Sequence, residues 1–225
     1  QAHGLATHTS DVDYRGVFVL PTVRFFKIPT EKPEETMWIE GSDDNTAWEF
    51  GHFMNMATFC NPTILETFLA PRADKPEVVG DDMARGYYEE PYTIGDDLRD
   101  LFPYVWNSKR VFDAFTGYSK NQQKKFLDKK DGRPEKYASA YLRVLYQGVQ
   151  LLETGTFTVD FRPTPIYDTL KRWKNKEYTR SEVMGITEDW ENKIEAAYEK
   201  NPNKETDFAK VNEFVVKIRQ QFWDW

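Results

Sequence analysis

One stretch decides the fold of this chain: Ser10-Asp11-Val12-Asp13-Tyr14-Arg15-Gly16-Val17-Phe18. Aromatic and β-branched residues over 13–20 predict a β-strand, which Pro21 ends. Asp11 and Asp13 stand at its entry, and residues two apart in a strand point to the same face. Two such carboxylates repel each other unless a hard cation such as Mg²⁺ or Mn²⁺ lies between them. The pair therefore suggests a metal site, although paired acids also occur as solvated or capping residues in turns.

Two further strands and two helices are predicted in the first part of the chain. The strands lie near 35–40 and over 44–48, separated by a turn at Gly41-Ser42. Apolar residues at helical spacing predict a helix over 50–58. A second short helix fits 63–69, between Pro62 and Pro71.

The remainder of the chain is predicted to be mainly helical. Residues 71–97 are rich in Pro, Gly and acids and predict a loop. Helices follow over 99–115, 118–129, 136–153, 165–176, 188–199 and 206–225, with a β-like piece over 156–161. The predicted fold class is α+β, a mixed sheet with helices (residues 1–75) followed by a mainly helical C-terminal region (residues 76–225). The apolar C-terminal residues Phe222, Trp223 and Trp225 are expected to dock on this helical region or on a second copy.

Composition excludes several classes of protein. The chain has 225 residues, of which 40% are hydrophobic, so it can form a substantial core. A net charge of −7 argues against a bulk nucleic-acid coater. A single cysteine, Cys60, excludes an internal disulfide framework and suits a reducing cytoplasm. No apolar run approaches the roughly 20 residues that span a bilayer, so a cytoplasmic protein is expected. The sequence begins at Gln1 without methionine, so residues upstream are expected.

The stretch from His3 to Phe18 resembles the signature of a predicted nucleotidyltransferase family of the DNA polymerase β-like superfamily, found in bacteria and phages. In that family a Gly-Ser pair and a glycine loop precede Ser-Asp-x-Asp-x-Arg-Gly and an apolar strand. The Gly-Ser pair would lie just upstream of Gln1. The resemblance implies a nucleotidyltransferase sheet in which Asp11 and Asp13 bind Mg²⁺ or Mn²⁺, with Ser10 and Arg15 beside the nucleotide.

The same resemblance implies a third acid on a neighbouring strand, before an amphipathic helix. Asp44 occupies that place, and it would complete the metal site or act as general base. Asp43 and Asp44 are alternatively turn residues after Gly41-Ser42. Glu66, in a block that begins Asn61-Pro62, either contributes to the site or only supports the helix that it lies on.

Further family blocks lie in the helical part. Lys136 and Arg143 stand on one helical stripe and would grip the β- and γ-phosphates, although Ala140 replaces the histidine usual between them. Ser108 and Lys109 would bind phosphate, and Tyr118 would stack on a base or fill the core. A cluster over 120–130 contains five lysines and is either a solvated face or a patch for RNA or an acidic partner. His3 and His8 lack the further ligands that a zinc site needs.

These features predict an enzyme that transfers an NMP from an NTP such as ATP to a hydroxyl acceptor and releases pyrophosphate. The acceptor is left open among an RNA end, a protein side chain and a small molecule, and the oligomeric state is open too; no membrane partner is expected. The alternative is a catalytically inactive nucleotide-binding, regulatory or interaction module on the same fold. A metal-dependent phosphohydrolase would use the same acids but normally needs more His and Asp ligands.

Overall fold

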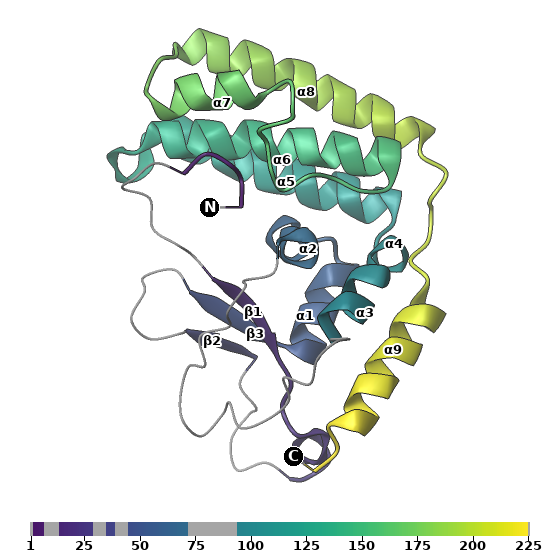
Figure 1. Cartoon of the computed structure of the whole chain (residues 1–225). Helices are drawn as coiled ribbons and strands as arrows, with labels where there is room; N and C mark the ends of the chain where they lie inside the picture. The colour runs from purple at the N-terminus through teal and green to yellow at the C-terminus, as the bar shows by residue number, and fades with distance from the viewer. Residues whose placement is uncertain (1, 7–13, 29–34, 39–44, 72–93, 225) are drawn as a thin grey trace.

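The computed structural model describes residues 2–6, 14–28, 35–38, 45–71 and 94–224. A small sheet with short helices beside it forms one part of the molecule, and long helices form the other (Figure 1). The first residues lie against the long helices, whereas the C-terminus lies at the far end of the sheet part (Figure 1). This architecture is the predicted α+β arrangement with a helical C-terminal region.

Among the described residues, the sheet contains three strands in the order β1-β3-β2. Strand β1 (Arg15–Phe18) is parallel to β3 (Thr46–Glu49), and the ladder pairs Arg15 with Thr46. Strand β2 (Thr36–Trp38) is antiparallel to β3. All four residues of β3 are buried, as expected of a central strand. The three predicted strands are confirmed within the described residues, and β1 ends two residues earlier than predicted.

Helices α1 (Phe50–Thr58) and α2 (Pro62–Leu69) follow β3 directly and confirm the predicted pair. Cys60 has a φ of 57° in the turn between them. The Asn61 side chain caps α2 by accepting hydrogen bonds from the backbone N–H groups of Thr63 and Ile64. The cap fixes where α2 begins and therefore where Glu66 lies.

The prediction of separate helices over 99–115 and 118–129 is wrong. The chain forms α3 (Ile94–Asp100), α4 (Phe102–Val105) and one long helix, α5 (Ser108–Leu127). Asn107 begins α5 because its side chain accepts a hydrogen bond from the backbone N–H of Arg110. Gly117 lies within α5, where a single glycine lowers stability without ending the helix. Helix α3 also begins inside the loop predicted over 71–97.

The rest of the helical part agrees more closely with prediction. After the 3₁₀ turn η2 (Lys130–Gly132) come α6 (Pro134–Thr154), α7 (Tyr167–Lys174), α8 (Arg180–Lys200) and α9 (Phe208–Gln221). Gly155 ends α6 with a φ of 81°. Helix α8 begins eight residues earlier than predicted because Thr179 caps it. The β-like piece over 156–161 is not a strand, and the Phe161 N–H donates instead to the His3 carbonyl at 3.2 Å.

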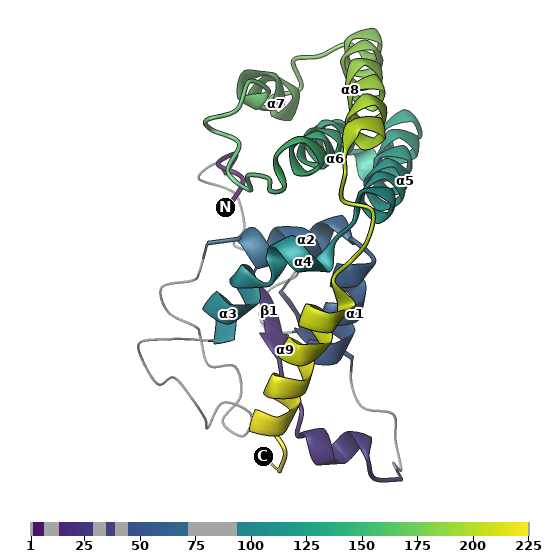
Figure 2. The same ribbon diagram turned by 90° about the vertical axis from the view of Figure 1, so that its right-hand side faces the viewer.

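Helix α9 returns to the sheet part of the molecule (Figure 2). Phe214 of α9 packs edge-on against Phe50, with ring centroids 5.9 Å apart. The chain then meets the 3₁₀ turn η1 (Thr22–Phe25), where the carbonyls of Phe222 and Trp223 accept hydrogen bonds from Thr22 and Val23. The tail therefore docks on the N-terminal part and not on the helical region, which corrects that part of the prediction. Docking on a second copy stays a prediction, and Trp225 lies outside the described residues. Within the described part of the chain, no helix combines the length and apolar character needed to cross a membrane.

A buried ion pair fastens α9 to the sheet. Arg219 donates from Nη1 and Nη2 to the two carboxylate oxygens of Glu49, at 2.7 and 2.9 Å. The Glu49 side chain is 4% exposed and that of Arg219 is 18% exposed. Glu49 also ends β3 and caps α1 through the Gly51 N–H. One carboxylate thus joins a strand, a helix start and the C-terminal helix.

Removing one member of this pair leaves a buried charge without its partner. We expect Arg219→Met to lower the free energy of unfolding by about 3–5 kcal/mol in urea denaturation. The control is Lys217→Met on the same helix, which breaks an exposed 2.8 Å pair with Asp97 and should cost no more than about 1 kcal/mol. Equal losses for the two variants would contradict the assignment.

Substitution of Gly117 is predicted to raise the free energy of unfolding, unlike loss of the ion pair. A Cβ added at Gly117 meets nothing within 4 Å, whereas one added at Gly148 of α6 would lie 2.5 Å from Ile194 Cδ1. Gly117→Ala should therefore raise the free energy of unfolding by about 0.5–1 kcal/mol, since alanine favours helix and only glycine's flexibility is lost. Gly148→Ala should show no such gain, and thermal unfolding of the two variants checks both.

Candidate active site

The acids predicted to bind metal, Asp11, Asp13 and Asp44, lie outside the described residues, as does Ser10. The structure describes the strands that follow them. The ladder of β1 and β3 begins with Arg15 beside Thr46, and Arg15 Nη1 donates to Thr46 Oγ1 at 3.1 Å. Just before it, Tyr14 donates its backbone N–H to Asn45 Oδ1 at 2.6 Å and Thr46 donates its own to the Tyr14 carbonyl. The two strands are therefore tied together at the end from which the acid-bearing segments lead.

Three segments far apart in sequence meet at His3. Its Nε2 lies 3.3 Å from Oε1 of Glu66 on α2, and its Nδ1 contacts Nη1 of Arg143 on α6. The rings of His3 and Phe161 lie 5.7 Å apart, and the Arg143 guanidinium lies over Phe161. The result is a chain of polar contacts, Arg143–His3–Glu66, against an aromatic ring. It joins the N-terminal segment, a helix of the sheet part and a helix of the helical part.

The chemistry of the partners fixes the protonation state of His3. A guanidinium has only donors, so Nδ1 must accept, and a neutral ring then carries its hydrogen on Nε2, facing Glu66. Burial and the charge of Arg143 lower the pKa of His3, which keeps the ring neutral. Burial raises the pKa of Glu66, but the His3 hydrogen bond and the Arg143 charge outweigh it and bring the pKa to about 2. The cluster therefore contains a cation, a neutral imidazole and an anion near neutral pH.

The segment 2–6 is also held through its backbone. The Tyr167 hydroxyl donates to the Gly4 carbonyl at 3.3 Å, and Lys174 Nζ donates to the Leu5 carbonyl. Gly4 has a φ of 67°, and a Cβ there would lie 2.6 Å from Cγ of Arg162, so the position requires glycine. Helix α7 and the loop before it thus hold the segment that leads to Asp11.

The other predicted site residues are not brought to this cluster. Ser108 is fully buried at the start of α5, and its hydroxyl has no hydrogen-bond partner in the described part of the chain. Exposed Lys109 pairs with Asp113 one turn along the helix. Tyr118 packs, half-buried, against the main hydrophobic core. Lys136 is exposed near the start of α6, two turns before Arg143 on the same helix.

The contacts of His3 and Lys174 are the features that sequence reasoning missed. The sequence relates His3 only to His8, as an incomplete zinc site. Among the described residues, no group of three or more His, Cys, Asp or Glu could hold a metal ion. The sequence feature that could have indicated a role for His3 is its place at the start of the family signature over 3–18. For Glu66 it is the block that begins Asn61-Pro62. Neither signal shows that the two blocks meet. Cys60 is buried, which raises its pKa to about 12 and makes it a poor nucleophile.

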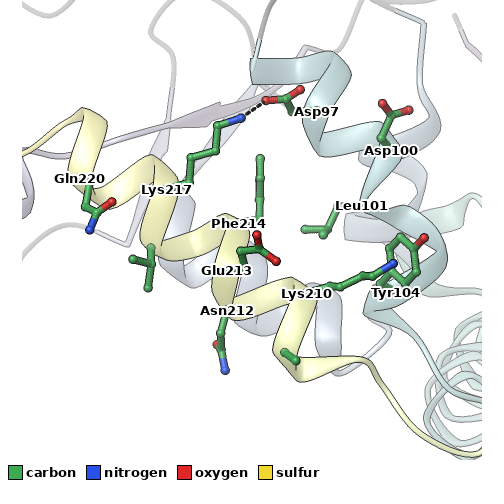
Figure 3. A pocket seen from close by; sticks show the side chains of 12 residues that line it. Asp97, Asp100, Leu101, Tyr104, Lys210, Asn212, Glu213, Phe214, Lys217 and Gln220 are labelled. Carbon is green, nitrogen blue, oxygen red and sulfur yellow. Dashed lines mark hydrogen bonds and ion pairs between the residues drawn. The ribbon is translucent and has the colours of Figure 1, made fainter.

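A separate groove of about 790 Å³ lies between α3, α4 and α9 (Figure 3). Its cations are already engaged, because Lys217 pairs with Asp97 at 2.8 Å and Lys210 lies over the Tyr104 ring at 3.7 Å. Asp100 and Glu213 add negative charge to the lining. The groove is therefore a poor place for a triphosphate.

Residues 1–217 match the model of the RlaP family, described as an RNA repair pathway DNA polymerase beta family. The chain belongs to the RlaP family. It is also similar to an uncharacterized protein, MJ0002, of Methanocaldococcus jannaschii, with 29% identity over 155 residues, 68% of this chain and 57% of that protein. The chain thus spans little more than half of that relative's length. No solved structure matches it.

Membership of the RlaP family confirms the predicted relationship to DNA polymerase β-like proteins. It also suggests nucleotidyltransferase activity. The Arg143–His3–Glu66 cluster lies within the matched residues, as do all the predicted site residues.

The cluster predicts how stability depends on pH. Folded-state pKa values of both His3 and Glu66 are depressed, so their stabilising contribution is complete above the unfolded values and falls in acid. The Glu66 part should be lost between about pH 4.5 and pH 2. Glu66→Gln should lower the free energy of unfolding at pH 7 by about 1.5–3 kcal/mol and flatten this acid limb. Denaturation curves across this pH range check both effects, and an unchanged acid limb would contradict the assignment.

Proposed function

We propose that this RlaP-family protein is a metal-dependent nucleotidyltransferase that transfers an NMP from an NTP to a hydroxyl acceptor and releases pyrophosphate. The observation that carries the proposal is the parallel ladder of β1 and β3, which begins at Arg15 and Thr46. Asp13 and Asp44 each stand two residues before these partners in the sequence. A ladder continued by two residues would therefore set the two acids side by side on neighbouring strands, with Asp11 close to Asp13.

Three carboxylates from two neighbouring strands form the all-oxygen donor set that suits Mg²⁺ or Mn²⁺. In the proposal Asp11 and Asp13 hold the metal, and Asp44 completes the set or accepts the proton of the attacking hydroxyl. The bound metal would supply charge stabilisation to the oxygens of the phosphate undergoing attack. Arg15 follows Asp13 by two residues in the sequence, and in the proposal it lies beside the same acids.

Arg143 and Lys136 are proposed to bind the leaving phosphates. Arg143 is oriented by His3, which in turn bonds Glu66, so its guanidinium loses less freedom on binding an anion. His3 and Glu66 act in this proposal as positioning residues. Lys136 stands two turns away on the exposed face of α6, at the distance expected of a second contact on an extended triphosphate.

Nucleotide binding tests the proposal. The full-length protein is titrated by calorimetry with each of the four NTPs in the presence of Mg²⁺, and again after chelation with EDTA. We expect binding that requires Mg²⁺ and that Asp11→Ala, Asp13→Ala removes. Arg143→Met, which keeps the apolar stem but loses the charge, should weaken NTP binding more than it weakens NMP binding, because it acts on the β- and γ-phosphates.

The matched control is Lys217→Met on α9, whose cation pairs with Asp97 and was not assigned to the site. It should bind all nucleotides as the unaltered protein does. A folded protein that binds no NTP with Mg²⁺, or whose binding survives loss of both aspartates, would contradict the proposal.

A further inference from the structure

The charge of this acidic chain is distributed unevenly. Residues 120–136 and 167–180, called here the basic face, contain twelve of the 30 Lys and Arg residues but five of the 37 Asp and Glu residues. These segments cover the end of α5, η2, the start of α6, and α7 with its turn into α8. The basic face is thus strongly positive in a protein whose net charge is −7.

The two segments lie together at one end of the helical part (Figure 1). Phe126 of α5 and Tyr178 after α7 have ring centroids 6.0 Å apart, and Tyr178 also contacts Trp173 at 6.5 Å. A hydrophobic cluster that includes Phe126, Tyr137 and Trp173 lies beneath them. The packing therefore fixes both segments in one rigid surface.

Most cations of the basic face point into solvent. The exposed ones are Lys120, Lys124, Lys129, Lys130, Arg133, Lys136, Lys171, Arg172, Lys176 and Arg180. Arg172 is engaged with Glu182 at 2.6 Å, and the nearby carboxylate of Asp131 is engaged by the Tyr137 hydroxyl at 2.7 Å. The surface consequently combines many exposed positive charges with few exposed negative ones.

The basic face is continuous with the candidate active site. Lys174 and Tyr167, both on α7, hold the carbonyls of Leu5 and Gly4 in the segment that leads to Asp11. Lys136 belongs to the basic face and also to the helix that carries Arg143. A chain of phosphates bound along the basic face would therefore end near the site of nucleotidyl transfer.

We propose that the basic face binds the phosphate backbone of an RNA strand whose terminal hydroxyl is the acceptor. The assignment of this strand as acceptor rests on the proposed function, whereas binding itself does not. A single triphosphate carries too few charges to match the eight exposed cations that remain besides Lys136 and Arg172, and a polyanion with regularly spaced phosphates fits them. RNA is the polyanion that the description of the RlaP family names.

The test measures affinity by fluorescence anisotropy with an end-labelled single-stranded RNA over a range of KCl concentrations. The variant Lys124→Gln, Lys130→Gln, Lys176→Gln removes one exposed charge from each of α5, η2 and the α7–α8 turn. The control, Lys193→Gln, Lys200→Gln, Lys204→Gln, removes three exposed charges from α8 and the segment after it. The two variants have the same net charge, so a difference between them reports location.

We expect the first variant to bind RNA on the order of tenfold more weakly in low salt. Its plot of log affinity against log salt should be shallower by about 2, since each lost phosphate contact contributes about 0.7 for a single strand. The control should keep both the affinity and the slope. Equal effects of the two variants, or no RNA binding by the unaltered protein, would overturn the proposal.

Mg²⁺-dependent NTP binding by the first variant separates this inference from the proposed function. Retained NTP binding with weakened RNA binding supports the inference. Retained NTP binding with unchanged RNA binding overturns the inference alone. RNA binding by the basic face in a protein that binds no NTP would overturn the proposed function but leave the surface assigned.

Discussion

The contact of His3 with Glu66 and Arg143 is the interaction on which the arrangement of the candidate site depends. The sheet part supplies Glu66, the helical part supplies Arg143, and His3 stands between them at the start of the segment that leads to Asp11. A neutral imidazole suits this place because it accepts from a guanidinium on one side and donates to a carboxylate on the other. A protonated ring would face Arg143 with a second positive charge. The lowered pKa of His3 is therefore a condition for the contact as well as a consequence of burial.

A second polar contact holds the C-terminal helix α9 against the sheet. The Arg219–Glu49 pair links α9 to the end of β3, the strand that precedes α1. Glu49 lies five residues after Asp44 and ends the strand paired with β1. Both contacts restrain elements that lead, along the sequence, to the three acids. Catalytic residues must be held close to their productive geometry, and packed or hydrogen-bonded neighbours typically hold them there.

The sequence predicted much of the fold because its local signals are strong. Pro62 and Asn61 define the start of α2, Gly155 ends α6, and aromatic and β-branched residues before Pro21 identify β1. The errors arose where tertiary packing, and not local sequence, decided the structure. Helix α5 continues through Gly117 because it packs along its length against its neighbours. The segment over 156–161 makes one backbone hydrogen bond to His3, from the Phe161 N–H, and does not form a strand.

Site prediction was limited by a different cause. Sequence motifs identified Arg143 and Glu66 as separate blocks, but only the packing of α2 beside α6 shows that His3 joins them. Ser108 and Lys109 lie at the start of α5, away from this cluster. The part of α5 that contacts α6 close to Arg143 lies about four turns later, where Gln123 donates a hydrogen bond to the Tyr141 hydroxyl. Asp11, Asp13 and Asp44 lie outside the described residues, so their grouping stays a prediction.

The measurement that tests the account most directly is a crystal structure of the full-length protein with Mg²⁺ and a non-hydrolysable NTP analogue. The account predicts a metal held by Asp11, Asp13 and Asp44, with the β- and γ-phosphates facing Arg143 while His3 still bonds Glu66. A nucleotide bound elsewhere, such as in the groove between α3, α4 and α9, or a metal without these three acids, would contradict it.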